Sequence, residues 1–436
     1  MAERWTNWAR QQVCAPAVIE RPSSEEQVAA AVRRAAKEGL PVRAVGSGHS
    51  FTDIACTDGA MVDVSAMDRV LEADSSTGLV RVQAGISINA LGEALEGHGL
   101  ALENQGDVDT QALAGALATA THGTGLAFGN LSSRVESLRL VDGRGEVHEI
   151  DGGDELLAAR VGLGALGIVT ELTLRTVPLF TLRRSDVPRP LGETLDTMDG
   201  LVAGSDHWEF LVFPYSDVAL TRTSSRSDEA PNAVGERKLW LQEHLLENAV
   251  MGAFARTGRA LPRLIPRLNA TLSKLVSPST KVDRSWRVFA TRRAVRFTEM
   301  EYAIPRDCAR EAVEAVMDLV ERRRLPVTFP IEVRFTAGDD AFLSTAHGRQ
   351  TCYVAIHQYL GMEYESYFRA VERIMDGLGG RPHWGKRHYQ SADTLAGRYP
   401  EWDRFAAVRA QLDPEGRFEN DYTQRVLGPV RQPVAG

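Results

Sequence analysis

The chain has 436 residues, of which 43% are hydrophobic and 25% are charged. These proportions are typical of globular proteins, so they exclude a wholly disordered or collagen-like chain. The length predicts roughly two to three domains. The net charge of −8 offers no basic surface to phosphate backbones, and we therefore expect no nucleic acid partner.

The four cysteines, Cys14, Cys56, Cys308 and Cys352, lie far apart in the sequence. Because they form no C-x-x-C pair, we expect neither a disulfide framework nor a metal site. The first residues lack the basic and apolar regions of a signal peptide, and no run of about 18 apolar residues could cross a membrane. We therefore expect a cytoplasmic protein with no transmembrane segment.

The first 180 residues alternate short apolar runs with glycine-rich turns. A helix is predicted from Ser24, whose hydroxyl can cap it, to Gly39, a residue type common just after helix ends. The pattern further predicts strands over 41–45, 60–64, 79–84, 135–140 and 168–177, and helices over 88–95 and 111–118.

Residues 181–225 have the pattern of strands, whereas 226–285 begin as a polar loop and continue as helices around 239–255 and 262–276. Strands are predicted over 287–302, 327–336 and 351–360, with helices over 306–323 and 364–378 between them. This mixture predicts an α+β fold. The composition changes near residue 178, which we interpret as a domain boundary, and we expect the C-terminal tail to return to the first domain.

Three glycines, Gly162, Gly164 and Gly167, match the G-x-G-x-x-G dinucleotide motif. That motif requires a strand before it and a helix after it. Here a helix is predicted before it and a strand after it, so the order is reversed. We interpret the segment as a helix-to-strand turn, which leaves an NAD-dependent dehydrogenase without other support.

A second glycine-rich loop, Gly46-Ser-Gly-His-Ser50, directly follows the strand predicted over 41–45. Glycines at this place let successive backbone N–H groups point the same way and form an anion nest suited to phosphates. The alternative is a plain surface turn. Further along, Gly115–Gly125 is almost free of bulky side chains, which permits close approach of a flat ligand or of another backbone.

Two features of the C-terminal half indicate catalysis. On the strand predicted over 327–336, Glu332 and Arg334 share one face and form either a solvated ion pair or a preorganised pair lining a cleft. His357 on the following strand either lines the same cleft or is a core histidine. Near the C-terminus, a tight segment presents His383 and Lys386 together.

Together these segments resemble the vanillyl-alcohol-oxidase superfamily of FAD-linked oxidoreductases, and within it the sugar-1,4-lactone oxidases. The resemblance covers nearly the whole chain. It implies a two-domain α+β flavoprotein, with an FAD-binding domain over 1–178, a cap domain over 179–385 whose antiparallel sheet is flanked by helices, and a segment over 386–436 that returns to the FAD-binding domain. The motifs that carry it lie at 5–8, 45–50, 121–125, 297–305, 332–340, 383–386 and 413–420.

The resemblance implies that FAD is bound covalently through His49. The loop Gly46–Ser50 would hold the pyrophosphate, which agrees with the anion nest. No cysteine lies near the Gly115–Gly125 segment, so a second covalent link is not expected. The residues implied in FAD binding are Arg43, Val45, Gly46, Ser47, Gly48, His49, Ser50, Gly106, Thr119, Thr121, His122, Gly123, Gly125, Ile168, Lys386 and Asn420.

The family oxidises a secondary alcohol beside a lactone carbonyl and passes hydride to flavin N5. The resemblance therefore implies a sugar lactone as the substrate, with the catalytic residues Glu332, Arg334, His357, His383 and Lys386. A fixed cation beside the flavin would stabilise the negative charge that reduction creates. We expect desolvation to lower the pKa of Lys386 toward that of a useful base.

Gly106 aligns with a position beside the flavin where glycine accompanies oxygen reactivity in relatives. This implies an oxidase that uses O2 and produces hydrogen peroxide. The alternatives are an alditol oxidase, which shares the Glu-x-Arg pair and the His-Trp-Gly-Lys segment, a dehydrogenase of the same family that uses another electron acceptor, and a non-catalytic flavin-binding scaffold.

Overall fold

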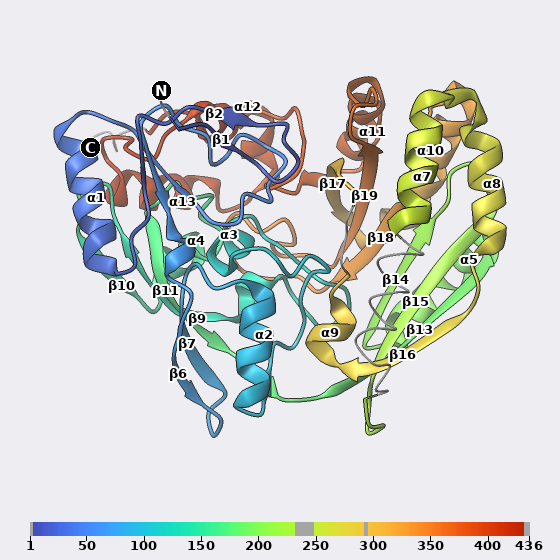
Figure 1. Ribbon diagram of the computed structural model, residues 1–436, viewed down its shortest axis with the longest axis horizontal. Coiled ribbons are helices and arrows are strands. Elements are labelled where there is room, and N and C mark those ends of the chain that lie inside the picture. The colour runs from blue at the N-terminus through green and yellow to red at the C-terminus, as the bar shows by residue number, and fades with distance from the viewer. Residues whose placement is uncertain (1–2, 232–247, 292–294, 431–436) are drawn as a thin grey trace.

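The computed structural model describes residues 3–231, 248–291 and 295–430. It has the α+β fold that the sequence predicts, with two groups of sheets and helices side by side (Figure 1). Among these described residues, no helix is both long enough and apolar enough to cross a membrane.

The N-terminal group contains a parallel sheet of order β3-β5-β4 and an antiparallel sheet of order β10-β9-β11-β7-β6. Helix α1 begins after Ser24, which accepts a hydrogen bond from the backbone N–H of Gln27, and ends before Gly39, whose φ is +66°. The predicted cap and helix end are thus confirmed. The elements are β1 (Trp5–Thr6), β2 (Val13–Cys14), β3 (Val18–Glu20), α1 (Glu25–Lys37), β4 (Val42–Val45), β5 (Ala60–Asp63), β6 (Val70–Asp74), β7 (Leu79–Gln83), α2 (Ile88–Gly97), β8 (Leu100–Ala101), α3 (Leu113–Ala118), β9 (Val135–Val141), β10 (Val147–Ile150), α4 (Gly153–Ala159), β11 (Ile168–Arg175) and β12 (Val177–Pro178).

The second group is built on one antiparallel sheet of order β16-β13-β15-β14-β18-β19-β17-β20, which we call the cap sheet. Its apolar face packs with α5, α10 and α11 into a single core that includes Phe210, Val333 and Val354. The elements are β13 (Thr181–Pro190), α5 (Leu191–Ala203), β14 (His207–Val212), β15 (Val218–Ser227), α7 (Asn248–Ala260), α8 (Ile265–Leu275), β16 (Ser279–Arg284), α9 (Ser285–Phe289), β17 (Phe297–Pro305), α10 (Ala309–Arg323), β18 (Ile331–Thr336), β19 (Thr351–Tyr359), α11 (Glu365–Gly377) and β20 (Arg381–Pro382).

The chain after the cap sheet packs against the N-terminal group. Helices α12 (Ala392–Leu395), α13 (Trp402–Leu412) and α14 (Asp421–Leu427) contribute Leu395, Phe405 and Tyr422, with neighbours, to the core that holds Leu91 and Leu138. Burial of these apolar side chains is what fixes the C-terminal segment there. The domain limits at residues 178 and 385 stay predictions.

The structure differs from the sequence predictions at three places in the cap. Helix α5 interrupts 181–225, a range predicted as strands, and its buried Leu195, Met198 and Val202 follow helical spacing. The strand predicted over 287–302 is in part helix α9, and β17 begins only at Phe297. Strand β16 was not predicted. Part of the helix predicted around 239–255 lies outside the described residues.

Candidate active site

A narrow cavity of about 150 Å³ lies where β4 ends, between α3 and the turn that precedes β11. Glycines and small side chains line most of it. The loop predicted as an anion nest lines it along its full length, and the three glycines of the reversed motif line it as well. The lining residues that bear on the cofactor are Arg43, Val45, Gly46, Ser47, Gly48, His49, Ser50, Gly115, Thr119, Gly162, Gly164 and Gly167.

Two positions in the loop after β4 favour glycine, one for lack of space and one for its backbone conformation. A Cβ on Gly46 would lie 2.5 Å from the Cβ of Ala112, and Gly48 has a φ of +64°. The backbone N–H groups of residues 47–50 donate no hydrogen bond within the described part of the chain. Successive free N–H groups in a glycine loop form a site for a phosphate, so the loop fits a dinucleotide pyrophosphate.

Arg43 lines the narrow cavity but has a structural role there. Its guanidinium donates hydrogen bonds to the carbonyl oxygens of Ile54, Leu163, Gly164 and Phe418, at 2.7–3.0 Å. Burial lowers the pKa of Arg43 to about 10, so the side chain is still a cation at neutral pH. Because four carbonyls occupy it, Arg43 ties the C-terminal segment to the cavity wall.

A wider cavity of about 570 Å³ adjoins the narrow one, and both are lined by His49, Ser50, Gln111 and Thr119. The walls of the wide cavity come from both groups of elements. They carry the predicted residues Gly106, Thr121, His122, Glu332, Arg334, His383 and Lys386, together with Trp8, Asp107, Asp109, Thr110 and Glu299. A dinucleotide-sized group with its reactive ring at the junction therefore fits the two cavities taken together.

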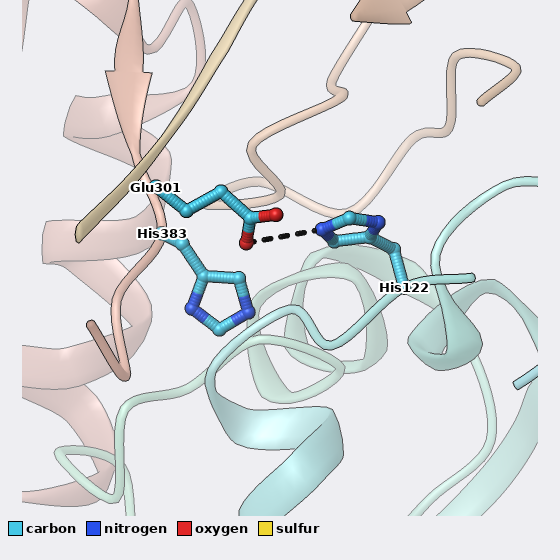
Figure 2. Close-up of side chains that lie close together, drawn as sticks. All are labelled: His122, Glu301 and His383. Carbon is cyan, nitrogen blue, oxygen red and sulfur yellow. Dashed lines mark hydrogen bonds and ion pairs between the residues drawn. The ribbon is translucent and has the colours of Figure 1, made fainter. Parts of the chain in front are cut away.

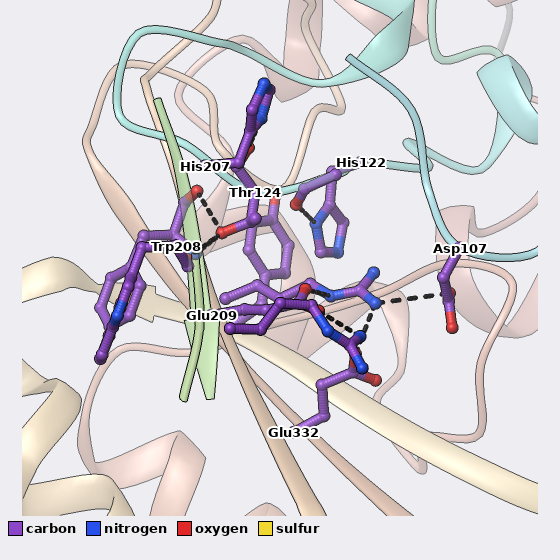
Figure 3. Close-up of polar contacts among 12 residues, drawn as sticks. Asp107, His122, Thr124, His207, Trp208, Glu209 and Glu332 are labelled. Atoms are coloured by element: carbon purple, nitrogen blue, oxygen red, sulfur yellow. Dashed lines mark hydrogen bonds and ion pairs between the residues drawn. The ribbon is translucent and has the colours of Figure 1, made fainter. Parts of the chain in front are cut away.

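Arg334 on β18 lines the wide cavity and pairs with three carboxylates, those of Asp107, Glu209 and Glu332, which Figure 3 labels. Its Nε lies 2.9 Å from Oε2 of Glu209, and its Nη2 lies 3.5 Å from Oδ1 of Asp107 and also bonds Glu332. Burial alone would lower the pKa of Arg334, but these carboxylates outweigh it and raise the pKa well above the ordinary value. Arg334 is therefore a permanent, oriented cation.

Lys386 is the second cation of the wide cavity, and our expectation for it was wrong. Its Nζ lies 2.5 Å from Oε1 of Glu299 and 2.8 Å from Oε2 of Glu301. Burial alone would lower the pKa of Lys386, as predicted, but the two glutamates outweigh burial and raise it above the ordinary value. Lys386 therefore stays protonated at neutral pH and is not a base.

Glu301 also brings two histidines together (Figure 2). Its Oε2 lies 3.3 Å from Nε2 of His122, whose ring stacks on Tyr353 at 3.4 Å between centroids, and His383 lies alongside. Two histidines and a carboxylate can bind a metal ion. Here the ammonium of Lys386 already supplies the cation beside Glu301, so the cluster has its charge neutralised by a side chain.

A backbone hydrogen bond indicates the tautomer of His383. The backbone N–H of Gly385 donates to its Nδ1 at 3.1 Å, which places the ring proton on Nε2. Burial, together with the nearby Lys386, lowers the pKa of His383 to about 3. His383, which lines the wide cavity, therefore keeps one ring N–H that can donate a hydrogen bond.

Five of the predicted residues lie outside both cavities. Gly123 and Gly125 belong to the segment that joins the cap sheet, where the N–H of Gly125 donates to the carbonyl of Phe335 at 2.6 Å. His357 lies behind Glu299, with 3.3 Å between its Nε2 and Oε1. The others are Ile168, which is a core residue, and Asn420, whose amide donates to three carbonyls of the 53–56 loop.

Four acidic residues at the site escaped the sequence analysis: Asp107, Glu209, Glu299 and Glu301. Glu299 and Glu301 alternate with apolar residues on the buried strand β17. Two carboxylates on one face of an otherwise apolar strand are costly without a cation, and this was the available signal. Nothing local marks Asp107 or Glu209, because their partner Arg334 is distant in the sequence.

A family model described as D-arabinono-1,4-lactone oxidase matches residues 172–426, and one described as FAD binding domain matches residues 16–151. The chain is 59% identical to an L-gulono-1,4-lactone dehydrogenase of Mycobacterium tuberculosis, over 98% of this chain and 100% of the relative. It is 33% identical to the L-gulonolactone oxidase of Mus musculus, over 97% and 98%. An alditol oxidase of a Streptomyces species is 30% identical, over 98% and 100%.

Among solved structures, a cholesterol oxidase from B. sterolicum superposes with a TM-score of 0.83 at 17% identity, covering 98% of this chain and 97% of that one. At this identity the likeness shows the fold alone. The fold, the FAD-binding domain and the two joined cavities define an FAD-linked oxidoreductase of the vanillyl-alcohol-oxidase type. More narrowly, the chain belongs to the D-arabinono-1,4-lactone oxidase family of sugar-lactone oxidoreductases, which act on CH–OH groups.

Proposed function

We propose that this enzyme oxidises the C2 secondary alcohol of an aldono-1,4-lactone such as L-gulono-1,4-lactone. The observation that carries the proposal is a pair of cations, the buried Arg334 and the partly buried Lys386, which line one cavity that adjoins the glycine-lined cavity. When bound, FAD supplies the hydride acceptor, flavin N5. The protein supplies binding, orientation and a fixed electrostatic field.

Each cation has a distinct task in this proposal. Arg334 would stabilise the negative charge that a bound flavin gains on reduction, and the carboxylates around Arg334 restrict its orientation in advance. Lys386 is held as an ammonium, so it donates hydrogen bonds to a substrate oxygen. Glu332 orients Arg334 and accepts a hydrogen bond from a sugar hydroxyl, and His383 donates one from Nε2.

The substrate is tested by anaerobic mixing of the flavin-loaded enzyme with L-gulono-1,4-lactone or with xylitol, following the flavin absorbance. Bleaching by the lactone supports the proposal, and Arg334→Met should slow it strongly. Bleaching by xylitol alone would instead support an alditol oxidase, the activity in the name of the Streptomyces relative. A flavin that neither compound bleaches would favour the non-catalytic scaffold.

Attachment of FAD to His49 is the second part of the proposal. Burial lowers the pKa of His49 to about 4, so the imidazole is neutral and has a free nitrogen lone pair at neutral pH. The hydroxyl of Thr110 lies 2.8 Å from Nε2, and Trp8 stacks on the ring with 5.4 Å between centroids. With Nε2–H donating to Thr110, the lone pair is on Nδ1, which we propose as the linking atom.

Acid precipitation tests the covalent link. Flavin that stays with the acid pellet in the wild type, and is released by His49→Ala, supports attachment at His49. Flavin that appears in the supernatant of the wild type would leave His49 as a non-covalent neighbour of the cofactor.

The electron acceptor has two candidates. Gly106 favours O2, because it lines the wide cavity and has no methyl group that could block the approach of oxygen. A Cβ at this position would lie 3.2 Å from both the Thr121 side chain and the His122 carbonyl oxygen. The name of the Mycobacterium tuberculosis relative favours another acceptor. Stopped-flow reoxidation by dissolved O2 decides between them: fast reoxidation with stoichiometric hydrogen peroxide, slowed by Gly106→Ala, supports the oxidase.

A further inference from the structure

Four charged residues of alternating sign form a row across the cap sheet. Asp186 on β13, Arg222 on β15, Glu209 on β14 and Arg334 on β18 are directly opposite one another in successive strand pairs. Residues that are directly opposite project from the same face of a sheet. The row therefore lies on the face opposite to the apolar core, and its last member lines the wide cavity.

The row is connected at every step by close ion pairs. Oδ1 of Asp186 lies 3.1 Å from Nε of Arg222, whose Nη1 lies 2.8 Å from Oε1 of Glu209. Oε2 of Glu209 lies 2.9 Å from Nε of Arg334. Glu209 thus uses one oxygen for each arginine. Its side chain is only 9% exposed, and the two guanidinium groups hold its pKa below the ordinary value despite burial.

Each nitrogen of Arg334 has a different use. Glu209 forms an ion pair with Nε at 2.9 Å that lacks hydrogen-bond geometry, whereas Nη2 donates a hydrogen bond to Glu332 and lies 3.5 Å from Asp107. For the remaining nitrogen, Nη1, no partner is found among the described residues. Carboxylates at two separate nitrogens of a planar guanidinium restrict its rotation, so the orientation of the third nitrogen is restricted as well.

Stability alone does not explain this row. Buried ion pairs are often no more stabilising than apolar residues of similar volume, because desolvation opposes the Coulomb attraction. The row instead ends at the cation that lines the cavity. A small cavity of about 30 Å³, lined by Arg184, Arg222, Glu209 and Arg334 among others, lies behind it.

We propose that Glu209 is a positioning residue, which, anchored through Arg222 to Asp186, sets the orientation of Arg334 so that Nη1 faces the substrate and flavin. This inference rests on the proposed function of the cavity. Glu209 itself does not line the wide cavity. Its effect on catalysis therefore passes through Arg334.

A double-mutant cycle tests the proposal on the flavin-loaded enzyme. Glu209→Gln keeps the side-chain volume but removes the charge, and the loss of one charge-assisted contact predicts a fall in kcat/KM for the lactone of about tenfold or more. In an Arg334→Lys background, Glu209→Gln should lower kcat/KM by less than about threefold, because the guanidinium that Glu209 positions is absent. Glu209→Asp, which keeps the charge, should retain more activity than Glu209→Gln.

The matched control is Glu25→Gln, which removes the carboxylate from another close ion pair, in which Nη2 of Arg139 lies 2.8 Å from Oε1 of Glu25.

The second readout is the flavin midpoint potential. Glu209→Gln should raise it, because a negative charge beside Arg334 is lost, and Glu25→Gln should leave it unchanged even if it lowers Tm.

Equal losses of kcat/KM from Glu209→Gln in both backgrounds, or a midpoint potential that does not move, would overturn the positioning role. A wild-type enzyme that binds no flavin, or that oxidises no lactone, would instead overturn the proposed function. The two failures are therefore distinguishable.

Discussion

Replacement of Lys386 by methionine should destabilise the protein more at pH 7.5 than at pH 5.5, a range in which the wild-type active site contributes no pH dependence. In the wild type, Lys386 neutralises Glu299 and Glu301, whose side chains are 9% and 3% exposed. Burial alone would raise the pKa of Glu299, but Lys386 and His357 hold it at about 2, and the pKa of Glu301 is likewise lowered well below the ordinary value. Both carboxylates are therefore charged throughout the neutral range.

Removing one partner of a buried ion pair costs about 3–5 kcal/mol, since the other charge is left uncompensated. For a chain of this size we take about 2 °C per kcal/mol, so Tm should fall by roughly 6–10 °C at pH 7.5 in Lys386→Met. The variant relieves part of the penalty by binding a proton, either on a glutamate or on a neighbouring histidine.

The sign of the pH effect follows from these shifts. Wild-type Glu299 and Glu301 have lowered folded pKa values, so their stabilisation is present above the unfolded value near 4.5 and lost only as the pH falls toward about 2. Their contribution is flat between pH 5.5 and 7.5. In Lys386→Met the folded pKa of the protonating group is raised, so stability is regained on acidification, by up to about 2.7 kcal/mol over two pH units for one proton.

Differential scanning fluorimetry of the wild type, Lys386→Met and Lys386→Arg at pH 5.5 and 7.5 measures this. The arginine variant keeps the cation and should follow the wild type in its pH dependence. A deficit of Lys386→Met that is equal at both pH values, or that grows on acidification, would refute the assignment of Lys386 as the counter-ion of two buried carboxylates.

Two other substitutions probe the cofactor loop and its support. Gly46→Ala should weaken FAD binding and lower the free energy of unfolding by about 1–3 kcal/mol, because its Cβ would lie 2.5 Å from the Cβ of Ala112. The control Gly200→Ala, at an open position in helix α5, should instead raise the free energy of unfolding by about 0.5–1 kcal/mol. Flavin titration and urea unfolding check both, and a Gly46→Ala protein with wild-type affinity for FAD would contradict the close-approach argument. Asn420→Ala should cost about 2–4 kcal/mol, since it removes the cap of α14 and three hydrogen bonds to the 53–56 loop. Urea unfolding measures that loss, and a change below 1 kcal/mol would be too small for these contacts.

Local signals in the sequence predicted a large part of the fold. Ser24 and Gly39 fixed the limits of α1 because a cap hydroxyl and a left-handed glycine act within one helical turn. Period-two alternation predicted the strand that carries Glu332 and Arg334. The same approach failed over 181–225 and 287–302, where short strands and helices with mixed apolar residues give similar patterns.

The sequence by itself determined the glycine loop for the cofactor, the pair on β18 and, through resemblance, the family. These depend on neighbouring residues and on motif order, which the chain carries locally. Only the tertiary structure decided the charge state of Lys386, because Glu299 and Glu301 reach it from a strand more than 80 residues earlier. Likewise, the row that holds Arg334 exists only through strand register, since pKa and orientation depend on distances between charges rather than on residue order.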